Sequence, residues 1–356
     1  MAADRADGSG RSRTLRQWAG RLVLLAIGAA TLYGLAPQIF DVWGQVPELR
    51  ALGWIGLVAM VACELISFAC AWGLHRVALP GLSWYAAGTT QLTSNAVSRA
   101  VPGGAAMGAG VSVKMWTIAG VDLGNAAGAL AATSLISTAT LFLLPFVALC
   151  VAAFGAPVPR NLALVAGGAG ILAALLFGLG TLLMASEGVA AAVARFASRT
   201  SAAVACRIGR EGLDCDEVMA RRAELVDALG ERWHAALGWA VGNWTFDYAA
   251  LAAAVLILED SRPRFGLVLM AYGAAAVLAM IPITPGGLGF VEAGLASLLT
   301  LAGIPATDAL LATLAYRIVS FWLPLALGPV AWLAFQRHYH QRVDLEELPE
   351  VPASAA

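Results

Sequence analysis

Long apolar runs separated by short polar connections dominate the chain. A helix needs about 20 apolar residues to cross the hydrocarbon layer of a bilayer, which is roughly 30 Å thick. Runs of about this length, each expected to span the membrane, lie at 22–40, 52–74, 127–153, 162–184, 235–258, 266–283 and 309–335. Shorter or small-residue-rich runs lie at 84–101, 104–121 and 286–303. The pattern predicts an all-α, polytopic integral membrane protein with about eight to ten membrane segments.

Each of the three shorter runs borders a Pro-Gly-Gly motif, at 102–104 or at 285–287. Proline removes a backbone donor, and two glycines permit a sharp turn. Inside a bilayer the freed backbone groups must be satisfied by protein or water, so such a break does not face lipid. We therefore expect two broken or re-entrant helices that line a cavity.

The two motifs belong to an internal repeat. Pro-Gly-Gly at 102–104 is followed by Ala-Gly-Val at 119–121, and the motif at 285–287 is followed at the same spacing by Ala-Gly-Ile at 302–304. Further identities in this frame are Thr117 with Thr300, Ala126 with Ala309, and Ser137 with Ser320. Duplicated discontinuous helices are typical of transporters that bind near the membrane midplane. The alternative is a coincidence of small-residue packing motifs. We predict that the two motifs face each other across one cavity.

Composition supports the membrane assignment and excludes several functions. The chain is 60% hydrophobic and 13% charged, whereas soluble domains are near half apolar and a quarter charged. We therefore expect no soluble catalytic domain. The net charge of −1 argues against nucleic acid as a partner. Neither the five cysteines nor the four histidines have the spacing of a disulfide framework or a metal site, so no metal or cofactor is expected.

Arginine distribution predicts the orientation. Five arginines lie in residues 1–21 and seven in the loop 185–233, against one, one and two in the connections 41–51, 154–161 and 259–265. Because arginine-rich connections stay cytoplasmic, the N-terminus and the long loop are expected inside a bacterial plasma membrane. Arg337 and Arg342 place the C-terminus inside as well.

The same loop divides the chain into two membrane halves. The expected organisation is a basic cytoplasmic tail, a first membrane half, an amphipathic linker, a second membrane half and a polar, disordered tail, at 1–20, 21–184, 185–233, 234–336 and 337–356. Apolar residues recur at helical spacing in the first part of the linker. This pattern fits either a helix in the headgroup layer or a solvated linker helix.

Three segments carry a family resemblance. AVSRAVPGGAAMGAGVSVKMWTIAGV, IPITPGGLGFVEAGLASLLTLAGIP and LAYRIVSFWLPLALG resemble the transmembrane region of the lysylphosphatidylglycerol synthase/flippase family, and the resemblance covers about residues 20–336. The combination of Pro-Gly-Gly-Leu-Gly, a glutamate three residues later and Tyr-Arg in the next helix is distinctive. The first block departs from the family pattern, because Ala105-Ala106 and Lys114 stand where the family often has an acidic residue and an arginine.

The resemblance implies flippase-like translocation or other handling of a phospholipid or related envelope amphiphile, with membrane lipids as partners. It does not imply aminoacyl transfer, because bifunctional members carry a soluble transferase domain after the membrane region, and this chain ends about twenty residues past its last expected span. Two alternatives remain. One is a non-transporting subunit or scaffold for a cell-envelope lipid or glycosyl-transferring enzyme. The other, a membrane-embedded enzyme, has no supporting catalytic cluster.

Ionisable groups inside membrane spans are expensive and therefore functional candidates. One hypothesis is that Arg317, Arg99 and Lys114 attract a lipid phosphate while carboxylates complete the cavity, since arginine matches phosphate geometry. The alternatives are that Arg317 pairs with Glu292 or Asp247 to stabilise the bundle, and that Arg99 and Lys114 snorkel to the interface. The expected substrate-binding set, with no catalytic residue, is Glu292, Arg317, Asp247, Pro285, Gly286, Gly287, Gly289, Pro102, Gly103, Gly104, Arg99, Lys114 and Glu64.

Overall fold

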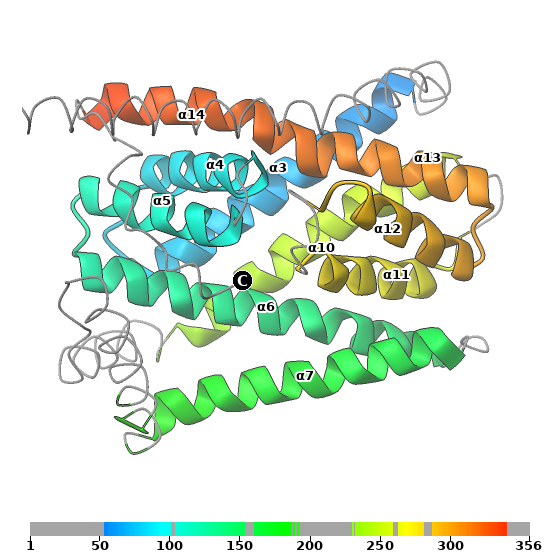
Figure 1. The fold of residues 1–356 in the computed structure, drawn as a ribbon, viewed down its shortest axis with the longest axis horizontal. Coiled ribbons are helices and arrows are strands. Elements are labelled where there is room, and N and C mark those ends of the chain that lie inside the picture. The colour runs from blue at the N-terminus through cyan, green and yellow to red at the C-terminus, as the bar shows by residue number, and fades with distance from the viewer. Residues whose placement is uncertain are drawn as a thin grey trace, which may run out of the picture.

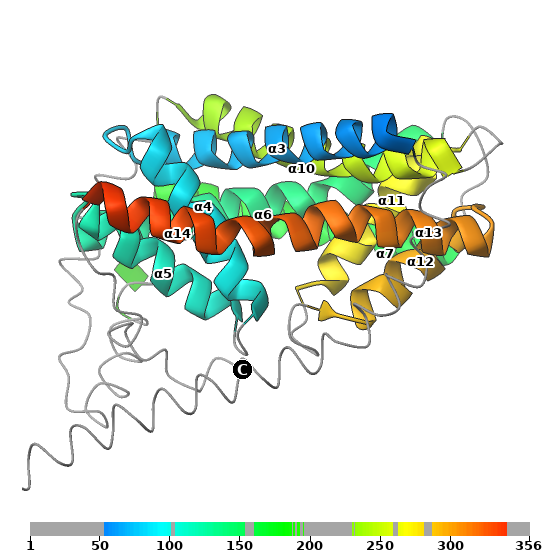
Figure 2. The same ribbon diagram turned by 90° about the horizontal axis from the view of Figure 1, so that it is seen from above.

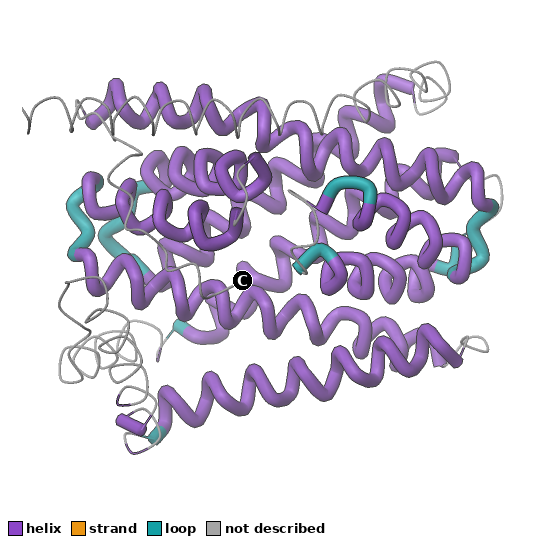
Figure 3. The backbone as a smooth tube through the Cα atoms, viewed as in Figure 1, coloured by secondary structure: helices purple, strands orange, loops and turns teal. Residues whose placement is uncertain are grey.

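A computed structural model describes residues 53–100, 104–153, 160–186, 232–258, 263–280 and 287–339, with a few single positions between 188 and 230. Within these ranges the chain consists of helices and short connections, without a strand (Figure 3). The expected all-α fold is confirmed. The first expected span at 22–40, most of the linker 185–233 and the polar tail lie outside the described residues.

Four of the described helices are long and apolar enough to cross a membrane. They are α3 (Gly53–Ala78), α6 (Leu123–Ala153), α10 (Trp233–Leu258) and a composite helix from Ala306 to Tyr339. The composite helix contains α13 (Ala306–Arg317), a π-helical turn η3 (Ile318–Trp322) and α14 (Leu323–Tyr339). Each corresponds to an expected span, and all run roughly along the long axis of the molecule (Figure 1).

A fifth long helix, α7 (Arg160–Ala185), packs against α6 at the edge of the molecule (Figure 1). Leu164, Ile171 and Leu175 on this helix are 63 to 67% exposed. Water would make such an apolar surface unfavourable, whereas lipid accepts it. The outer face of α7 therefore has the character of a lipid-facing surface.

The remaining helices form two short hairpins, α4 (Trp84–Ala100) with α5 (Gly104–Ile118), and α11 (Phe265–Leu278) with α12 (Phe290–Leu301). They contain 12 to 17 residues each, which corresponds to about 18 to 26 Å and is too short to cross alone. The expectation of a full span at 266–283 is therefore wrong. Its apolar run is long enough, but the helix ends at Leu278, before the second Pro-Gly-Gly motif.

The backbone confirms the internal repeat. Gly120 after α5 and Gly303 after α12 have φ values of 96° and 97°. Matching hydrogen bonds close both helix ends, from Val121 N to Trp116 O at 3.0 Å and from Ile304 N to Leu299 O at 3.1 Å. These are Schellman-type ends, in which glycine adopts the left-handed conformation at low cost. The next helices, α6 and α13, also begin at equivalent positions of the repeat.

The two copies have opposite orientations. The α6 helix and the composite α13–α14 helix run in opposite directions along the long axis, and the two hairpins enter from opposite ends (Figures 1 and 2). The inner ends of α4 and α5 lie opposite the inner ends of α11 and α12 near the centre of the molecule. The architecture is therefore an inverted repeat, and the inner ends of its two hairpins lie near the middle of the molecule.

Polar residues of α4 show how a half-span helix remains stable among apolar neighbours. Thr89 and Thr93 donate their hydroxyl protons to the carbonyl oxygens of Tyr85 and Thr89, one turn earlier, at 2.7 and 2.8 Å. Such bonds satisfy a hydroxyl without a second helix. Close packing against α14 also holds α4 in place. Gly328 of α14 lies so near α4 that a Cβ added to it would be 2.2 Å from the Cβ of Ala96 on α4.

Candidate functional site

The inner end of the second hairpin is built on glycine. Gly287 and Gly289 have φ values of 70° and 78°, which residues with a Cβ rarely adopt. A Cβ on Gly287 would also lie 2.6 Å from Cγ2 of Val291. This turn leads directly into α12 and places Glu292 in its first turn. A carboxylate is favoured there because the helix N-terminus carries a partial positive charge.

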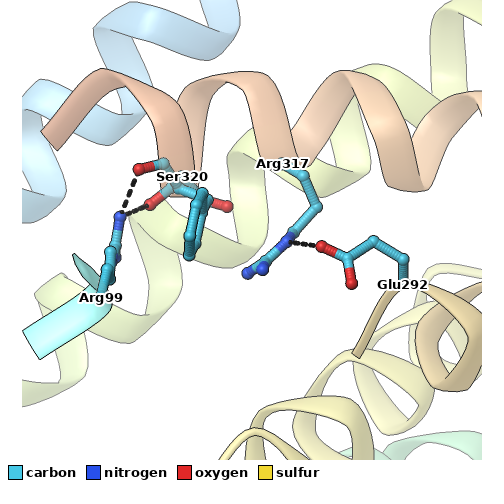
Figure 4. Close-up of polar contacts among 5 residues, drawn as sticks. Arg99, Glu292, Arg317 and Ser320 are labelled. Atoms are coloured by element: carbon cyan, nitrogen blue, oxygen red, sulfur yellow. Dashed lines mark hydrogen bonds and ion pairs between the residues drawn. The ribbon is translucent and has the colours of Figure 1, made fainter. Parts of the chain in front are cut away.

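Glu292 forms an ion pair with Arg317, the last residue of α13. Nε of Arg317 donates to Oε1 of Glu292 at 2.6 Å (Figure 4). The two side chains are 12% and 16% exposed, and the other Glu292 oxygen, Oε2, is buried without a partner among the described residues. The pairing that the sequence suggested is therefore present. Arg317 lies about a third of the way along the 34-residue helix.

The π-helical turn after Arg317 positions a second guanidinium. Nη1 of Arg99 donates to the backbone oxygens of Ser320 and Phe321, at 2.5 and 2.8 Å (Figure 4). A π-turn leaves the regular i to i−4 ladder and so makes carbonyl groups available to other donors. Arg99 therefore joins the inner end of α4 to the composite helix.

Both guanidiniums also lie over one aromatic ring. The ring centroid of Phe321 is 4.4 Å from Cζ of Arg317 and 5.3 Å from Cζ of Arg99. An aromatic face attracts a cation, and the effect grows when the cation is desolvated. Two arginines, one from each copy of the repeat, are thus held near the centre of the molecule with Glu292 beside one of them.

Asp247 lies at the centre of a separate hydrogen-bond cluster. It accepts a hydrogen bond from the Tyr272 hydroxyl, and its Oδ2 accepts another from the Tyr316 hydroxyl at 2.9 Å. The three residues lie on α10, α11 and α13, so one carboxyl group connects three helices. Tyr272 is 2% exposed. Because a buried acceptor without a donor is costly, the tyrosines satisfy Asp247 where water is scarce.

Glu64 belongs to a polar contact between α3 and α10. Its carboxyl group interacts with that of Asp247, and the side chain is 3% exposed. One turn away, Asn243 Nδ2 donates to Ser67 Oγ at 2.7 Å, and Ser67 Oγ donates to Asn243 O at 2.9 Å. The Ser67–Asn243 pair fixes the register of the antiparallel helices α3 and α10.

Removing a phenol from the Asp247 cluster should destabilise the fold. Tyr272→Phe and Tyr316→Phe are each expected to lower the free energy of unfolding by about 1–3 kcal/mol, because each removes a donor to a buried carboxyl group. Thermal unfolding in detergent measures the effect. Tyr248→Phe is the matched control, since the Tyr248 hydroxyl donates to Phe265 O at an exposed position. Equal melting temperatures for all three variants would contradict the role of the cluster.

The structure does not bring every expected site residue together. It groups Arg99, Arg317 and Glu292, and places Asp247 and Glu64 in the adjacent cluster. Lys114 lies ten residues after Gly104 on α5, which is about 15 Å along the helix axis from the inner end of the first hairpin. The expected residues Pro102, Gly103, Pro285 and Gly286 lie outside the described residues. A single cavity shared by both motifs stays a prediction.

Sequence reasoning missed two features of the site. Tyr272 gave a weak signal, as a hydroxyl in an otherwise apolar helix. The residues 318–322 of the π-turn contain neither proline nor glycine, but Pro324 follows them and has no N–H to donate to the carbonyl oxygen of Ser320.

The fold defines the class of protein, a polytopic α-helical membrane protein with an inverted repeat and paired charges near its centre. The family model described as the lysylphosphatidylglycerol synthase TM region matches residues 5–328. The chain belongs to this family. It is therefore a multi-pass membrane protein of a lipid-related family, and the TM region of that family is a non-catalytic domain.

A curated relative gives a shorter match. A UPF0104 membrane protein of Methanothermobacter thermautotrophicus is 32% identical over 91 residues, which are 26% of each chain. The match thus spans about a quarter of the relative's length. No solved structure matches the chain.

Proposed function

We propose that the protein moves a phospholipid or a related envelope amphiphile between the leaflets of the membrane. One observation carries the proposal: Arg99 and Arg317, from the two inverted copies, converge where the two hairpins meet. Inverted repeats with helices broken at the midplane are a common architecture of transporters that alternate access around a central site.

Charge favours an anionic headgroup at this site. Two guanidiniums and one carboxylate, that of Glu292, form the arginine cluster, and arginine recognises phosphate through paired hydrogen bonds. Glu292 holds Arg317 through Nε, so the pair also orients the guanidinium. In this account the ion pair positions a phosphate ligand while the tyrosine-bound Asp247 maintains the helix arrangement behind it.

The assay follows labelled lipid in proteoliposomes. Fluorescent phosphatidylglycerol and lysyl-phosphatidylglycerol are placed in vesicles with or without the purified full chain, and an impermeant quencher reports the outer-leaflet fraction. The proposal expects lipid to reach the quencher faster with protein than in empty vesicles or in vesicles with an unrelated helical membrane protein. Equal rates in all three preparations would reject translocation by the chain alone.

The alternative is a non-transporting subunit or scaffold for an enzyme of envelope-lipid or glycosyl transfer, and the non-catalytic character of the family's TM region supports it. In both proposals the chain is not itself an enzyme. Failure of translocation together with stable copurification of such an enzyme would favour the scaffold.

The proposal also includes an orientation in a bacterial plasma membrane, with the N-terminus cytoplasmic. The C-terminal ends of α7 and α14 lie at the same end of the molecule (Figure 1). We therefore expect the loop 185–233 and the C-terminal tail, which follow these ends, to lie on one side of the membrane. Because seven arginines lie in that loop, we assign this side to the cytoplasm.

Cysteine labelling tests the orientation. An impermeant maleimide added to intact cells is expected to miss Cys206 and Cys215 and to label a Ser261→Cys variant, whose cysteine lies in the opposite connection. Mass spectrometry identifies the labelled peptides. Efficient labelling of Cys206 or Cys215 from outside would reverse the assigned topology.

A further inference from the structure

A second polar feature lies in the first half of the molecule, outside the arginine cluster. A cavity of about 310 Å³ lies among α3, α4, α5, α6 and α10, at the lower end of the size range of small-molecule sites. Hydroxyl groups from three helices line it, those of Ser94, Ser98, Ser112, Thr133, Ser134, Ser137 and Thr138. Ser94 and Thr133 already donate to the carbonyl oxygens of Gly108 and Ala129, at 2.8 Å each, and Ser137 Oγ accepts from Trp244 Nε1 at 3.2 Å. In a bilayer the other hydroxyl groups of the cavity are unfavourable unless water or a ligand satisfies them.

The wall of this cavity carries no formal charge from Asp, Glu, Lys or Arg among the described residues that line it. Its remaining polar side chains are the amides Gln91 and Asn243 and the imidazole of His75. A charged ligand would lack a counter-ion here, whereas hydroxyl groups can both donate to and accept from such a wall. The chemistry of the wall therefore selects an uncharged ligand with several hydroxyl groups.

His75 supplies an independent sign of a missing partner. Its Nε2 lies 2.8 Å from Oε1 of Gln91, and because an amide oxygen only accepts, Nε2 is the donor. In the neutral ring Nδ1 is then an acceptor, and it is buried without a hydrogen-bond partner in the described part of the chain. The side chain is only 9% exposed and packs edge-on against Trp116 at 5.0 Å between ring centroids. His75 therefore adds an uncharged ring with an unmet acceptor to the polar wall of the cavity.

The cavity is connected by sequence to the arginine cluster. Ser98 lines the cavity, and the next residue, Arg99, reaches the π-turn beside Arg317. Ala105 of α5, just after the first Pro-Gly-Gly, also lines the cavity. The first hairpin thus borders the hydroxyl-lined cavity, and the second hairpin supplies Glu292 of the arginine cluster.

We propose that the hydroxyl-lined cavity binds an uncharged, polyhydroxylated group, the sugar or glycerol of a lipid headgroup. This assignment rests on the proposed function only for the lipid as the source of the group. Binding is measured without any movement of lipid, so its failure is separate from failure of translocation.

The experiment measures lipid binding to the purified full chain by native mass spectrometry in a polyoxyethylene detergent, which has no sugar headgroup. The probes are diglucosyl-diacylglycerol, phosphatidylglycerol and phosphatidylcholine with the same acyl chains, and methyl glucoside as a free sugar. The test variant is the double substitution Ser112→Ala with Thr138→Val. The matched control is Thr117→Val, whose hydroxyl donates to Val113 O at an exposed position.

A polyol-bearing probe is expected to bind at least about tenfold more tightly than phosphatidylcholine, and the double variant should lose about tenfold, as loss of ligand hydrogen bonds predicts. Thr117→Val should bind like the native chain. Preference for the glycolipid identifies a sugar, and equally tight binding of methyl glucoside identifies a free sugar as the source. Preference for phosphatidylglycerol identifies glycerol only when the double variant loses it, because the arginine cluster by itself also favours this anionic lipid. Equal affinity for every lipid, or unchanged affinity in the double variant, would overturn the proposal and leave a cavity that holds water.

Discussion

Arg317→Gln is expected to abolish phospholipid movement in proteoliposomes while leaving the folded protein largely intact. The substitution removes one of the two guanidiniums that converge near the centre of the molecule. Glutamine keeps a polar side chain of moderate length but carries no charge for a phosphate. The expected readout is a translocation rate indistinguishable from empty vesicles, with expression and melting temperature near those of the native chain. Arg160→Gln, at the exposed start of α7, is the matched control and should retain activity.

Glu292→Gln is expected to have the same effect, since Glu292 orients Arg317 at 2.6 Å. A purely structural ion pair predicts a different pattern. Each single variant would then leave one partly buried charge uncompensated and lose about 3–5 kcal/mol of stability. The double variant Glu292→Gln/Arg317→Gln distinguishes the two. Loss of folded protein in both single variants, with recovery in the double variant, would show a structural pair and contradict its role in binding.

Gly104→Ala is expected to prevent correct folding of the first hairpin. A Cβ at this position would lie 1.8 Å from the backbone oxygen of Ser98 and 2.7 Å from its carbonyl carbon. Because both are backbone atoms, α4 and α5 would have to separate, which we expect to cost about 3 kcal/mol or more. Size-exclusion chromatography and thermal unfolding in detergent measure the loss.

Gly168→Ala on α7 provides the control for this substitution. A Cβ there meets nothing within 4 Å, and alanine is the better helix former. Its stability should equal or slightly exceed that of the native chain. A Gly104→Ala variant as stable as Gly168→Ala would show that the hairpin does not depend on this close approach.

The repeat and the long helices were predictable from sequence because both depend on local chemistry. Glycine at 120 and 303 marks two helix ends with nearly the same φ, and the apolar runs at 52–74 and 235–258 became α3 and α10. The length rule failed at α11, where the apolar run continues past the helix end. Run length alone does not distinguish a crossing from the first arm of a re-entrant hairpin.

The site was only partly predictable. The high cost of an ionisable group inside a membrane span was enough to identify Glu292, Arg317, Asp247 and Glu64 as candidates. The sequence left open whether Glu292 or Asp247 pairs with Arg317. That choice depends on tertiary packing. Two tyrosine hydroxyl groups donate hydrogen bonds to Asp247, whereas Arg317 donates to Glu292. The hydroxyl-lined cavity was not predicted either, because serine and threonine are common on membrane helices. Only the packed structure shows that hydroxyl groups of three helices meet in a cavity enclosed by five helices.

Photo-crosslinking of a lipid headgroup reveals whether its phosphate enters the arginine cluster. The full chain is reconstituted with phosphatidylglycerol that carries a photoreactive group beside its phosphate, illuminated, and mapped by mass spectrometry. We expect crosslinks to peptides that contain Arg99 and Arg317, and we expect these crosslinks to be lost in Arg317→Gln. Crosslinks confined to outer surfaces, such as the α7 face around Leu175, and unchanged in that variant, would contradict entry of a lipid headgroup into the arginine cluster.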